Sequence, residues 1–538
     1  RFLSVSWARR CVKETDLYKM TRNSTIKIRR ALLSVSDKTG IIDLANSLQK
    51  ENVEIISTGG TLEHLRENNI EAIDISSFTG SPEMMGGRVK TLHPKVHAGI
   101  LSRRIKDKDE IEKNSIEEID LVVVNLYPFK KTISKKSSLE DAIENIDIGG
   151  PTMTRAAAKN FYHVAVISSP NDYEDFKNEF EKNKEISYET RLMLAKKAFG
   201  LITDYDLAIS DYLGALDQNN LPDSIFGKFI KVDELRYGEN PHQKAAFYLD
   251  DNKKSSGISS AVQLQGKELS YNNIADTDAA IECVSNFSEP SCVIVKHANP
   301  CGVASSENIL GAYKKAFACD PTSAFGGIIA FNKELDEKTS NFLKDNQFIE
   351  VVAAPKFTNG ALESFQDKKN VRLLEIKNLK KSDSGMKFHS VNSGLLLQSI
   401  DTGEIHINDL KTVSKRIPNQ DELTNSFFAW KVCKYVKSNA IVYASNSQTL
   451  GIGAGQMSRI DSAEIAVRKA KKAGFNLKGS CMASDAFFPF RDSIDEAAKN
   501  GISCVIQPGG SIRDEEVISA ADEADMIMIF TGMRHFRH

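Results

Sequence analysis

The sequence lacks the features that mark several large classes of protein. No apolar run in its 538 residues approaches the length of a membrane-spanning helix. Its eight cysteines are scattered and form no Cys-x-x-Cys pair, which indicates neither a disulfide framework nor a zinc finger. Seventy basic residues balance 72 acidic ones, so general nucleic-acid binding has no support. We therefore expect a cytoplasmic protein in a reducing compartment, with neither nucleic-acid nor membrane partners.

The length of the chain requires more than one hydrophobic core, and two to four domains are expected. Residues 1–19 contain the acidic Glu14 and Asp16 as well as basic residues, which fits a basic, acid-poor transit peptide poorly. We expect residues 1–25 to be a disordered or non-native tail. Folded sequence is expected from Ile26. The stretch Asn219–Lys231 is mixed in character, which predicts a boundary near residue 220 and domains over 26–219 and 220–538.

The first domain shows strands that alternate with helices. Apolar strands are expected at 31–35, 54–57, 121–126 and 163–167, with helices at 41–49, from 62 onward and over 187–215. This alternation predicts a parallel sheet that is covered on both faces. Ligands of such sheets bind at the carboxyl ends of the strands.

The second domain is also α/β in pattern, but longer and less regular. No repeat of fixed period stands out, and the polar residues 368–384 are expected to form an exposed excursion. Strands are expected at 292–295, 327–331, 440–444, 449–452, 503–506 and 526–530.

Two turns in the first domain have the composition of anion-binding loops. Ser36–Gly40 and Ser57–Thr61 place hydroxyls, glycines and one lysine at helix starts, where backbone N–H groups attract anions. Plain helix capping is the alternative for either turn alone. Neither is a Walker loop, so nucleoside triphosphate binding is not indicated.

The segment Gly86–Gly99 combines a Gly-Gly pair with several cations and two histidines. A solvated basic loop is the simpler interpretation, but a Gly-Gly turn can aim several side chains at one point. Tyr127 follows the end of a buried strand, and Asp147 precedes a Gly-Gly pair and an alanine-rich helix. Together these segments indicate a site that stabilises an oxyanion.

These motifs resemble the inosinate (IMP) cyclohydrolase domain of a family of bifunctional purine biosynthesis enzymes, over residues 29–215. The resemblance implies a methylglyoxal-synthase-like parallel sheet. It also implies that Lys90 and Lys159 stabilise an oxyanion while Tyr127 and Asp147 move protons. It assigns the 5′-phosphate of the substrate to Ser36, Lys38, Ser57, Gly60 and Thr61, and the base to Arg88, Lys90, Thr91, Asn125, Tyr127, Asp147 and Lys159.

In the second domain, an apolar strand delivers Lys296 and His297 at its carboxyl end. A histidine titrates near neutrality and suits general-base work, and a neighbouring lysine can stabilise an oxyanion. Two solvated residues at a strand end are the alternative. Pro300-Cys301 suggests a zinc deaminase, but Ala304 stands where the second cysteine of that signature belongs. A catalytic zinc is therefore rejected, and no metal is expected.

Two further segments allow more than one interpretation. Gly451–Arg459 imitates a dinucleotide loop, but Gln456 replaces the last glycine, which weakens a nicotinamide-dependent dehydrogenase as an alternative. Ser484–Asp492 contains three aromatic residues that could be core or could form a slot for a flat heterocycle. A non-catalytic nucleotide-binding or RNA-binding regulator is the other alternative, without support from charge or from basic-aromatic platforms.

From about residue 230 onward, the sequence resembles the transformylase domain of the same bifunctional family. The resemblance implies two cytidine-deaminase-like subdomains without catalytic zinc, and a homodimer that shares the transformylase site. It assigns the ribotide to Arg236, Tyr237, Lys296, His297, Gly326, Glu350, Asn439, Phe487 and Arg534, and the folate co-substrate to Arg459, Phe490 and Asp492.

The two resemblances together imply a two-step activity. A formyl group passes from 10-formyltetrahydrofolate to the aminoimidazole ribotide AICAR, which gives FAICAR, and FAICAR then closes to IMP with loss of water. In the first step His297 is the base, while Lys296 and Asn439 stabilise the tetrahedral oxyanion. A chain with only one working site is the alternative within this class.

Overall fold

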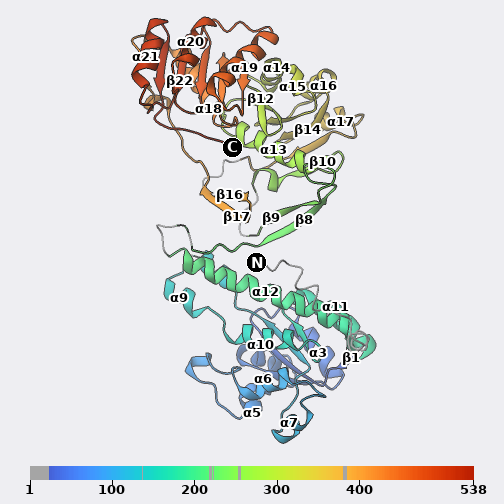
Figure 1. The fold of residues 1–538 in the computed structure, drawn as a ribbon. Coiled ribbons are helices and arrows are strands. Elements are labelled where there is room, and N and C mark those ends of the chain that lie inside the picture. Colours follow the sequence, from blue (N-terminus) through green and yellow to red (C-terminus); the bar gives the residue numbers. More distant parts are fainter. Residues whose placement is uncertain (1–23, 136, 217–220, 222, 252–255, 380–384) are drawn as a thin grey trace. The chain divides into compact units, whose positions relative to one another are not determined.

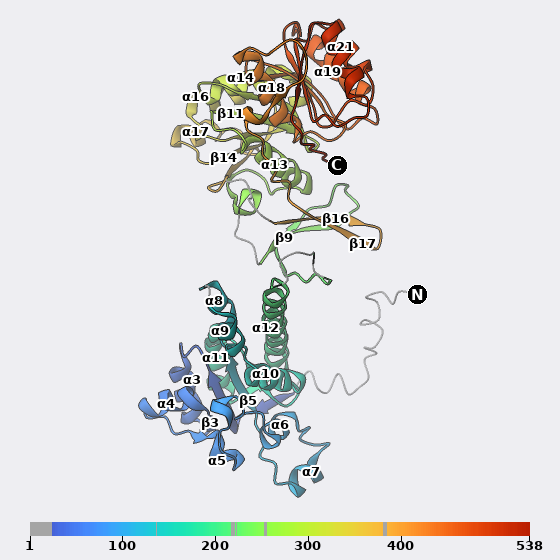
Figure 2. The same ribbon diagram turned by 90° about the vertical axis from the view of Figure 1, so that its left-hand side faces the viewer.

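The computed structural model describes residues 24–135, 137–216, 221, 223–251, 256–379 and 385–538. The expected tail therefore lies outside the described residues, apart from Ser24 and Thr25. The chain divides into two compact units, one ending at Lys228 and the other beginning at Phe229 (Figures 1 and 2). The domain boundary near residue 220 stays a prediction.

The first unit is built on a five-stranded parallel sheet, as the strand-helix alternation predicted. The order β4-β3-β2-β5-β6 places the first strand of the sheet, β2, in its centre, and the chain leaves it in both directions. The strands are β2 (Arg30–Val35), β3 (Glu54–Ser57), β4 (Ile73–Asp74), β5 (Leu121–Asn125) and β6 (Ala165–Ile167).

Successive residues of these strands face opposite sides of the sheet, and both sides are buried. Leu33 and Val123 pack with helices α3 (Ile41–Lys50) and α11 (Tyr173–Asn183) on one side. Leu32 and Val122 pack on the other side with α6 (Pro94–Leu101), α10 (Gly149–Lys159) and the long α12 (Tyr188–Gly214). The remaining elements are β1 (Thr25–Lys27), α4 (Gly59–Glu67), α5 (Ile75–Thr79), α7 (Lys108–Lys113), α8 (Phe129–Ser134), α9 (Leu139–Glu144) and β7 (Glu185–Ser187).

The second unit contains a twelve-stranded mixed sheet in which one topology occurs twice. The first copy is α13 (Tyr271–Val284), β11 (Ser291–Lys296), β12 (Asn299–Ser305), α14 (Ile309–Cys319), β13 (Gly327–Phe331), α16 (Glu337–Asn346), β14 (Ile349–Ala354), α17 (Asn359–Ser364) and β15 (Arg372–Glu375). The second copy is α18 (Gln420–Cys433), β19 (Ile441–Ser445), β20 (Gln448–Gly453), α19 (Arg459–Lys472), β21 (Cys481–Ser484), α20 (Asp492–Lys499), β22 (Cys504–Gln507), α21 (Asp514–Glu523) and β23 (Ile527–Phe530).

The two copies join where β12 and β20 lie side by side as antiparallel neighbours, with Ala304 opposite Gln448. One hydrophobic core contains residues of both copies, including Val293 and Val303 of the first and Val442 and Ile506 of the second. Outside the copies lie β8 (Phe229–Leu235), β9 (Ala245–Asp250), β10 (Val262–Gln265), α15 (Pro321–Ala324), β16 (Met386–Val391), β17 (Gly394–Ser399) and β18 (Lys411–Thr412).

Two expectations for the second unit were wrong in part. The excursion over 368–384 contains strand β15, whose Leu373 and Leu374 are fully buried in the sheet. Polar neighbours hid this short strand. Residues 299–305, where no strand was expected, form strand β12, in which a β-carbon on Gly302 would collide with the carbonyl oxygen of Ala316. Glycine is needed there because a helix packs directly on the strand backbone.

None of the helices in the described ranges combines the length and the hydropathy that a membrane crossing requires.

Candidate active sites

A cavity of about 760 Å³ lies at the carboxyl ends of β2, β3 and β5. Strands β2 and β5 are adjacent, but their connections run to opposite sides, which makes this edge the switch point where open α/β sheets bind ligands. Most residues that the sequence predicted for the first site line this cavity. They are Ser36, Lys38, Gly60, Thr61, Arg88, Lys90, Thr91, Asn125, Tyr127 and Asp147.

Two ammonium groups meet at the start of helix α4. A β-carbon on Gly59 would lie 3.3 Å from Lys90 Nζ, and one on Gly60 would lie 3.4 Å from Lys38 Nζ. The Gly-Gly pair thus leaves room for both lysines beside the unpaired N–H groups of the first helical turn. Two cations at a helix N-terminus form a strong site for a phosphate.

The Ser36-Asp37 turn beside this corner is fixed by Asn125. The Asn125 Oδ1 atom accepts hydrogen bonds from the backbone N–H groups of Ser36, at 2.6 Å, and Asp37, at 2.8 Å. Its Nδ2 atom donates to the Asp37 carbonyl oxygen at 2.8 Å. Asn125 was predicted to contact the base, but here its amide joins β5 to the turn after β2.

Asp147 lies at the opposite wall, at the start of helix α10. Its Oδ1 atom accepts a hydrogen bond from the Gly150 N–H at 2.8 Å, and its own N–H donates to the Tyr205 hydroxyl at 2.7 Å. A β-carbon on Gly150 would collide with the Asp147 carboxylate, and one on Gly149 would lie 2.8 Å from Thr91 Oγ1. The second Gly-Gly pair therefore lets two predicted site residues pack against the helix start.

Burial raises the pKa of Asp147 above 3.8, although hydrogen bonds from the Gly150 and Tyr127 backbone and the charge of Lys90 oppose the shift. A carboxyl group with a raised pKa is a better proton acceptor at neutral pH than an ordinary one. This agrees with the predicted proton-transfer role.

The same shift gives a prediction about stability. A carboxyl whose pKa is higher in the folded chain destabilises the fold once it ionises, so the penalty appears above pH 3.8 and reaches its full size above the raised pKa. Asp147→Asn should raise the melting temperature of the first unit at pH 7 but not at pH 3, while it lowers ring closure. Thermal unfolding at the two pH values tests this, and a lower melting temperature at pH 7 would contradict it.

The structure does not bring Ser57 and Lys159 to this cavity. Ser57 is fully buried, and its hydroxyl donates to the Leu33 carbonyl oxygen at 2.8 Å. Lys159 is exposed at the last residue of α10, about 15 Å along the helix from Gly149 at its first. Within one chain, Lys159 therefore does not share an oxyanion with Lys90.

Arg88 lines the cavity and forms an exposed, two-pronged ion pair with Glu144 of α9. Glu144 was not predicted. It could have been found only from a structure, because nothing in its sequence surroundings distinguishes it from other surface carboxylates.

In the second unit, Lys296 and His297 lie where β11 turns into β12. His297 and Ala298 form the two-residue hairpin turn and have φ angles of 52° and 55°. Such left-handed conformations are uncommon for residues other than glycine, and they concentrate at functional sites. Lys296 Nζ donates to the carbonyl oxygens of Phe325, at 3.1 Å, and Gly326, at 2.9 Å.

Asp276 of helix α13 holds this turn in place. Its carboxylate accepts hydrogen bonds from the backbone N–H groups of His297, at 3.2 Å, and Ala298, at 2.7 Å. Sequence reasoning missed Asp276, which precedes the turn by some twenty positions. The second copy has an equivalent contact, because Asn425 accepts from Ser447 N–H at 3.2 Å in the β19–β20 turn.

Asn439 lies near the His297 turn, to which Asn299 links it. Asn299 Oδ1 accepts from the Lys437 N–H at 3.0 Å. The amide of Asn439 donates to the Gln456 carbonyl oxygen at 2.9 Å and accepts from Arg459 Nη2 at 2.7 Å. The structure thus brings Lys296, His297 and Asn439 to one region of the sheet.

Arg459 was predicted to face the folate, but its guanidinium is buried. It forms an ion pair with Asp485, and the two side chains are 7% and 0% exposed. It also donates to Ser484 Oγ at 2.9 Å. Such a buried pair holds structure together, and breaking one partner leaves an uncompensated charge.

The other predicted residues of the second unit lie in varied surroundings. Glu350 accepts from Asn273 Nδ2 at 2.9 Å. The Arg236 guanidinium lies over the Tyr237 ring at 5.5 Å, and that of Arg513 lies over the exposed Phe490 ring at 4.7 Å. Exposed positions are taken by Phe487, Asp492 and Arg534, and Gly326 is buried with a φ of 65°.

The described residues contain no group of three or more histidine, cysteine or acidic side chains placed to hold a metal. Cys301, considered above as a zinc ligand, is buried with its Sγ 3.4 Å from the Ile294 carbonyl oxygen. Burial raises the pKa of its thiol far above the usual range. The residue packs as part of the core.

Comparison with known proteins agrees with this geometry. A family model described as an MGS-like domain matches residues 40–152, and one described as the AICARFT/IMPCHase bienzyme matches residues 157–469. A solved structure titled "Crystal structure of ForH" is 36% identical, over 35% of this chain and 100% of its own, with a TM-score of 0.31.

An MGS-like parallel sheet with a cavity at the carboxyl ends of its strands, followed by a duplicated α/β unit, defines an enzyme of two α/β units. The chain belongs to the AICARFT/IMPCHase bienzyme family. It is therefore a formyltransferase and a cyclohydrolase of purine biosynthesis, which formylates AICAR and closes the product to IMP. The resemblance drawn from the motifs is confirmed at the level of family, fold class and activity.

Proposed function

We propose that the two activities lie in separate units. The second unit formylates AICAR at the hairpin turn that carries Lys296 and His297, and the first unit closes FAICAR in the cavity at the end of β2, β3 and β5. The observation that carries the proposal is the strained His297 turn, which Asp276 clamps beside Asn439. The formyl donor is 10-formyltetrahydrofolate, bound as a co-substrate.

In formyl transfer, the AICAR amine attacks the formyl carbon of the donor. The amine is a weak nucleophile, because its lone pair is delocalised into the imidazole ring, so a base must remove its proton. His297 takes that role, and its side chain is exposed at the left-handed turn. Lys296, held by two carbonyl oxygens, and Asn439 stabilise the tetrahedral oxyanion. The intermediate collapses as the bond between the formyl carbon and the folate nitrogen breaks, and tetrahydrofolate leaves with the proton that His297 took up.

Ring closure demands less chemistry, because the attacking carboxamide and the formyl group belong to one molecule. Lys38, Lys90 and the start of α4 hold the 5′-phosphate, and Gly149-Gly150 lets Thr91 and Asp147 approach the base. Lys90 also lines the cavity and stabilises the oxygen that leaves as water. Asp147 and Tyr127 transfer the protons.

The placement of Lys159 outside the cavity bears on the assembly. An exposed lysine at the far end of α10 can complete a site only across a subunit boundary or by a change of structure. A homodimer with a shared transformylase site is part of the proposal, as is a cytoplasmic location. Gel filtration with light scattering tests the dimer.

The direct test is to supply the purified chain with AICAR and 10-formyltetrahydrofolate and to follow IMP by chromatography. IMP should form, and FAICAR alone should also be converted. Conversion of FAICAR without conversion of AICAR would leave only the cyclohydrolase half of the proposal standing.

A further inference from the structure

Residues 531–538 run along the second unit as an extended segment whose side chains alternate in burial. His535 is 4% exposed and Met533 and Arg537 are half-buried, whereas Arg534, Phe536 and His538 are exposed. A period of two means that one face of the segment packs against the protein and the other faces outward.

Three residues of the segment, Met533, His535 and Arg537, hold the inward face. His535 Nδ1 lies 2.6 Å from Asp401 Oδ2, and its ring centroid lies 5.4 Å from that of Trp430. The Arg537 guanidinium forms an ion pair with Glu282 at 2.6 Å. A β-carbon on Gly403 would lie 2.6 Å from Met533 Sδ, so the segment packs closely there too.

On the outward face, Arg534, Phe536 and His538 contact one another in sequence, with the last two rings edge to face. The Arg534 guanidinium lies 4.4 Å from the Phe536 ring centroid, and the Phe536 and His538 rings are 5.8 Å apart. Arg534 is the residue to which the ribotide was assigned. Its position is set by the neighbours on either side, because the segment has no helix or strand to hold it.

The backbone of the segment is bonded to the Asn439 region. The His535 N–H donates to the Asp485 carbonyl oxygen at 3.1 Å, and the Ser438 N–H donates to the Arg537 carbonyl oxygen at 2.9 Å. Asp485 in turn pairs with Arg459, which binds Asn439 Oδ1. A shift of His535 would therefore reach both Arg534 and Asn439.

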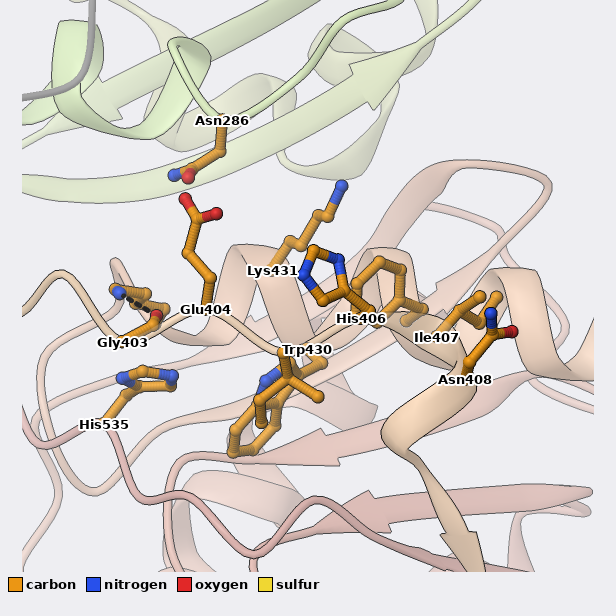
Figure 3. Close-up of a pocket in the computed structure, with 12 residues that line it drawn as sticks. Asn286, Gly403, Glu404, His406, Ile407, Asn408, Trp430, Lys431 and His535 are labelled. Atoms are coloured by element: carbon orange, nitrogen blue, oxygen red, sulfur yellow. Dashed lines mark hydrogen bonds between the residues drawn. The ribbon is translucent and has the colours of Figure 1, made fainter.

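Figure 3 shows the His535 ring at a cavity of about 550 Å³, which Trp430 of α18 and residues 403–408 also line. The ring is 4% exposed, with Asp401 as its polar partner and Trp430 as its aromatic neighbour. Burial acts to raise the pKa of Asp401, but His535 and Lys434 together hold it well below its ordinary value. The carboxylate stays ionised and accepts from the ring.

We propose that His535, held by Asp401 and Trp430, is a positioning residue for formyl transfer, which fixes the segment that presents Arg534 to the ribotide and borders Asn439. This rests on the proposed formyl-transfer site. The histidine acts through its neighbours and touches no substrate itself.

The test compares His535→Ala, Asp401→Asn and the double variant. Loss of a charge-assisted hydrogen bond should raise the KM for AICAR by about tenfold to a hundredfold, with a smaller change in kcat. Ring closure in the same chain should be unchanged, which reports an intact first unit. The double variant should be no worse than His535→Ala, because both changes remove one contact.

Hydrogen–deuterium exchange measures directly how firmly His535 holds residues 531–538. The peptides that cover 437–440 and 531–538 should exchange faster in both single variants, because the His535 and Ser438 amides lose their acceptors. His535→Gln keeps a donor for Asp401 and should recover part of the affinity for AICAR. Lys431→Ala is the matched control: it lines the same cavity, with its ammonium 4.8 Å over the Phe427 ring, and should behave as wild type.

An unchanged KM for AICAR in Asp401→Asn would overturn the proposal even if His535→Ala fails to fold. Faster exchange without a change in formyl transfer would also overturn it, since the segment would then be anchored without effect on the reaction. Failure of the proposed function looks different, because the wild-type chain would form no FAICAR while residues 531–538 stay protected.

Discussion

Replacing His297 by alanine is expected to reduce formyl transfer by about 10²–10⁴-fold, the usual contribution of a general base, and to leave ring closure at its wild-type rate. This expectation rests on the position of His297 in the structure. His297 occupies a left-handed turn that Asp276 clamps, next to Lys296 and the Asn439 segment. Parallel assays with AICAR and with FAICAR measure the two rates in one preparation.

His389 provides the matched control, because it is exposed on strand β16 of the same unit. His389→Ala should keep both activities. If His297→Ala lost both activities equally, the assignment of the two reactions to separate units would be wrong. If it lost neither, the turn would be structural and another group would have to act as the base.

The second large effect is expected for Lys90→Ala. Its ammonium lies beside Gly59 at the start of α4 and at the edge of the cavity, where it can serve both the phosphate and the developing oxyanion. Removal of an oxyanion donor costs about 10²–10³-fold in rate. Ring closure should fall by at least that factor, and FAICAR should accumulate from AICAR.

This variant also tests why one chain carries both activities. Our hypothesis is that the equilibrium constant of formyl transfer is close to one, and that irreversible ring closure removes FAICAR and so drives the transfer forward. Net formylation by Lys90→Ala should therefore slow as FAICAR builds up. Addition of an enzyme whose first unit is wild type should restore the rate of net formylation. Unchanged net formylation with no detectable FAICAR would contradict the hypothesis. Lys95→Ala, in the same basic segment but outside the cavity lining, is the control.

Much of the fold could be predicted from hydrophobic pattern. Strands β2, β3, β5, β19 and β23 were placed within about one residue, because each is a short apolar run between turn residues. Strands β12 and β15 were not, because Pro300, Gly302 and polar neighbours mask them. The internal duplication was not evident from the sequence pattern either, and only the family resemblance implied two similar subdomains. The duplication is preserved in the order of elements, while the turn residues have diverged to His297-Ala298 in one copy and Asn446-Ser447 in the other.

The sites show the same division. Most residues of the first site could be predicted from motifs, because those motifs follow strands of a parallel sheet whose carboxyl ends meet at one edge. Contacts that depend on side-chain direction could not be predicted. Asn125 binds a neighbouring turn, Ser57 points into the core, and Arg459 is buried with Asp485. The tethers Asp276 and Asp401 are remote in sequence from the residues they hold, so no local pattern indicates them.

The junction between β12 and β20 has a consequence for how the second unit folds. Each copy taken alone would end in an unpaired edge strand, and its share of the common core would face water. The two copies must therefore fold and unfold as one cooperative body, although their turn residues have diverged. A destabilising change in the copy that lacks the histidine will loosen the histidine turn as well. Inactivating substitutions in this enzyme should accordingly be found on both sides of that junction, and not only beside the reacting groups.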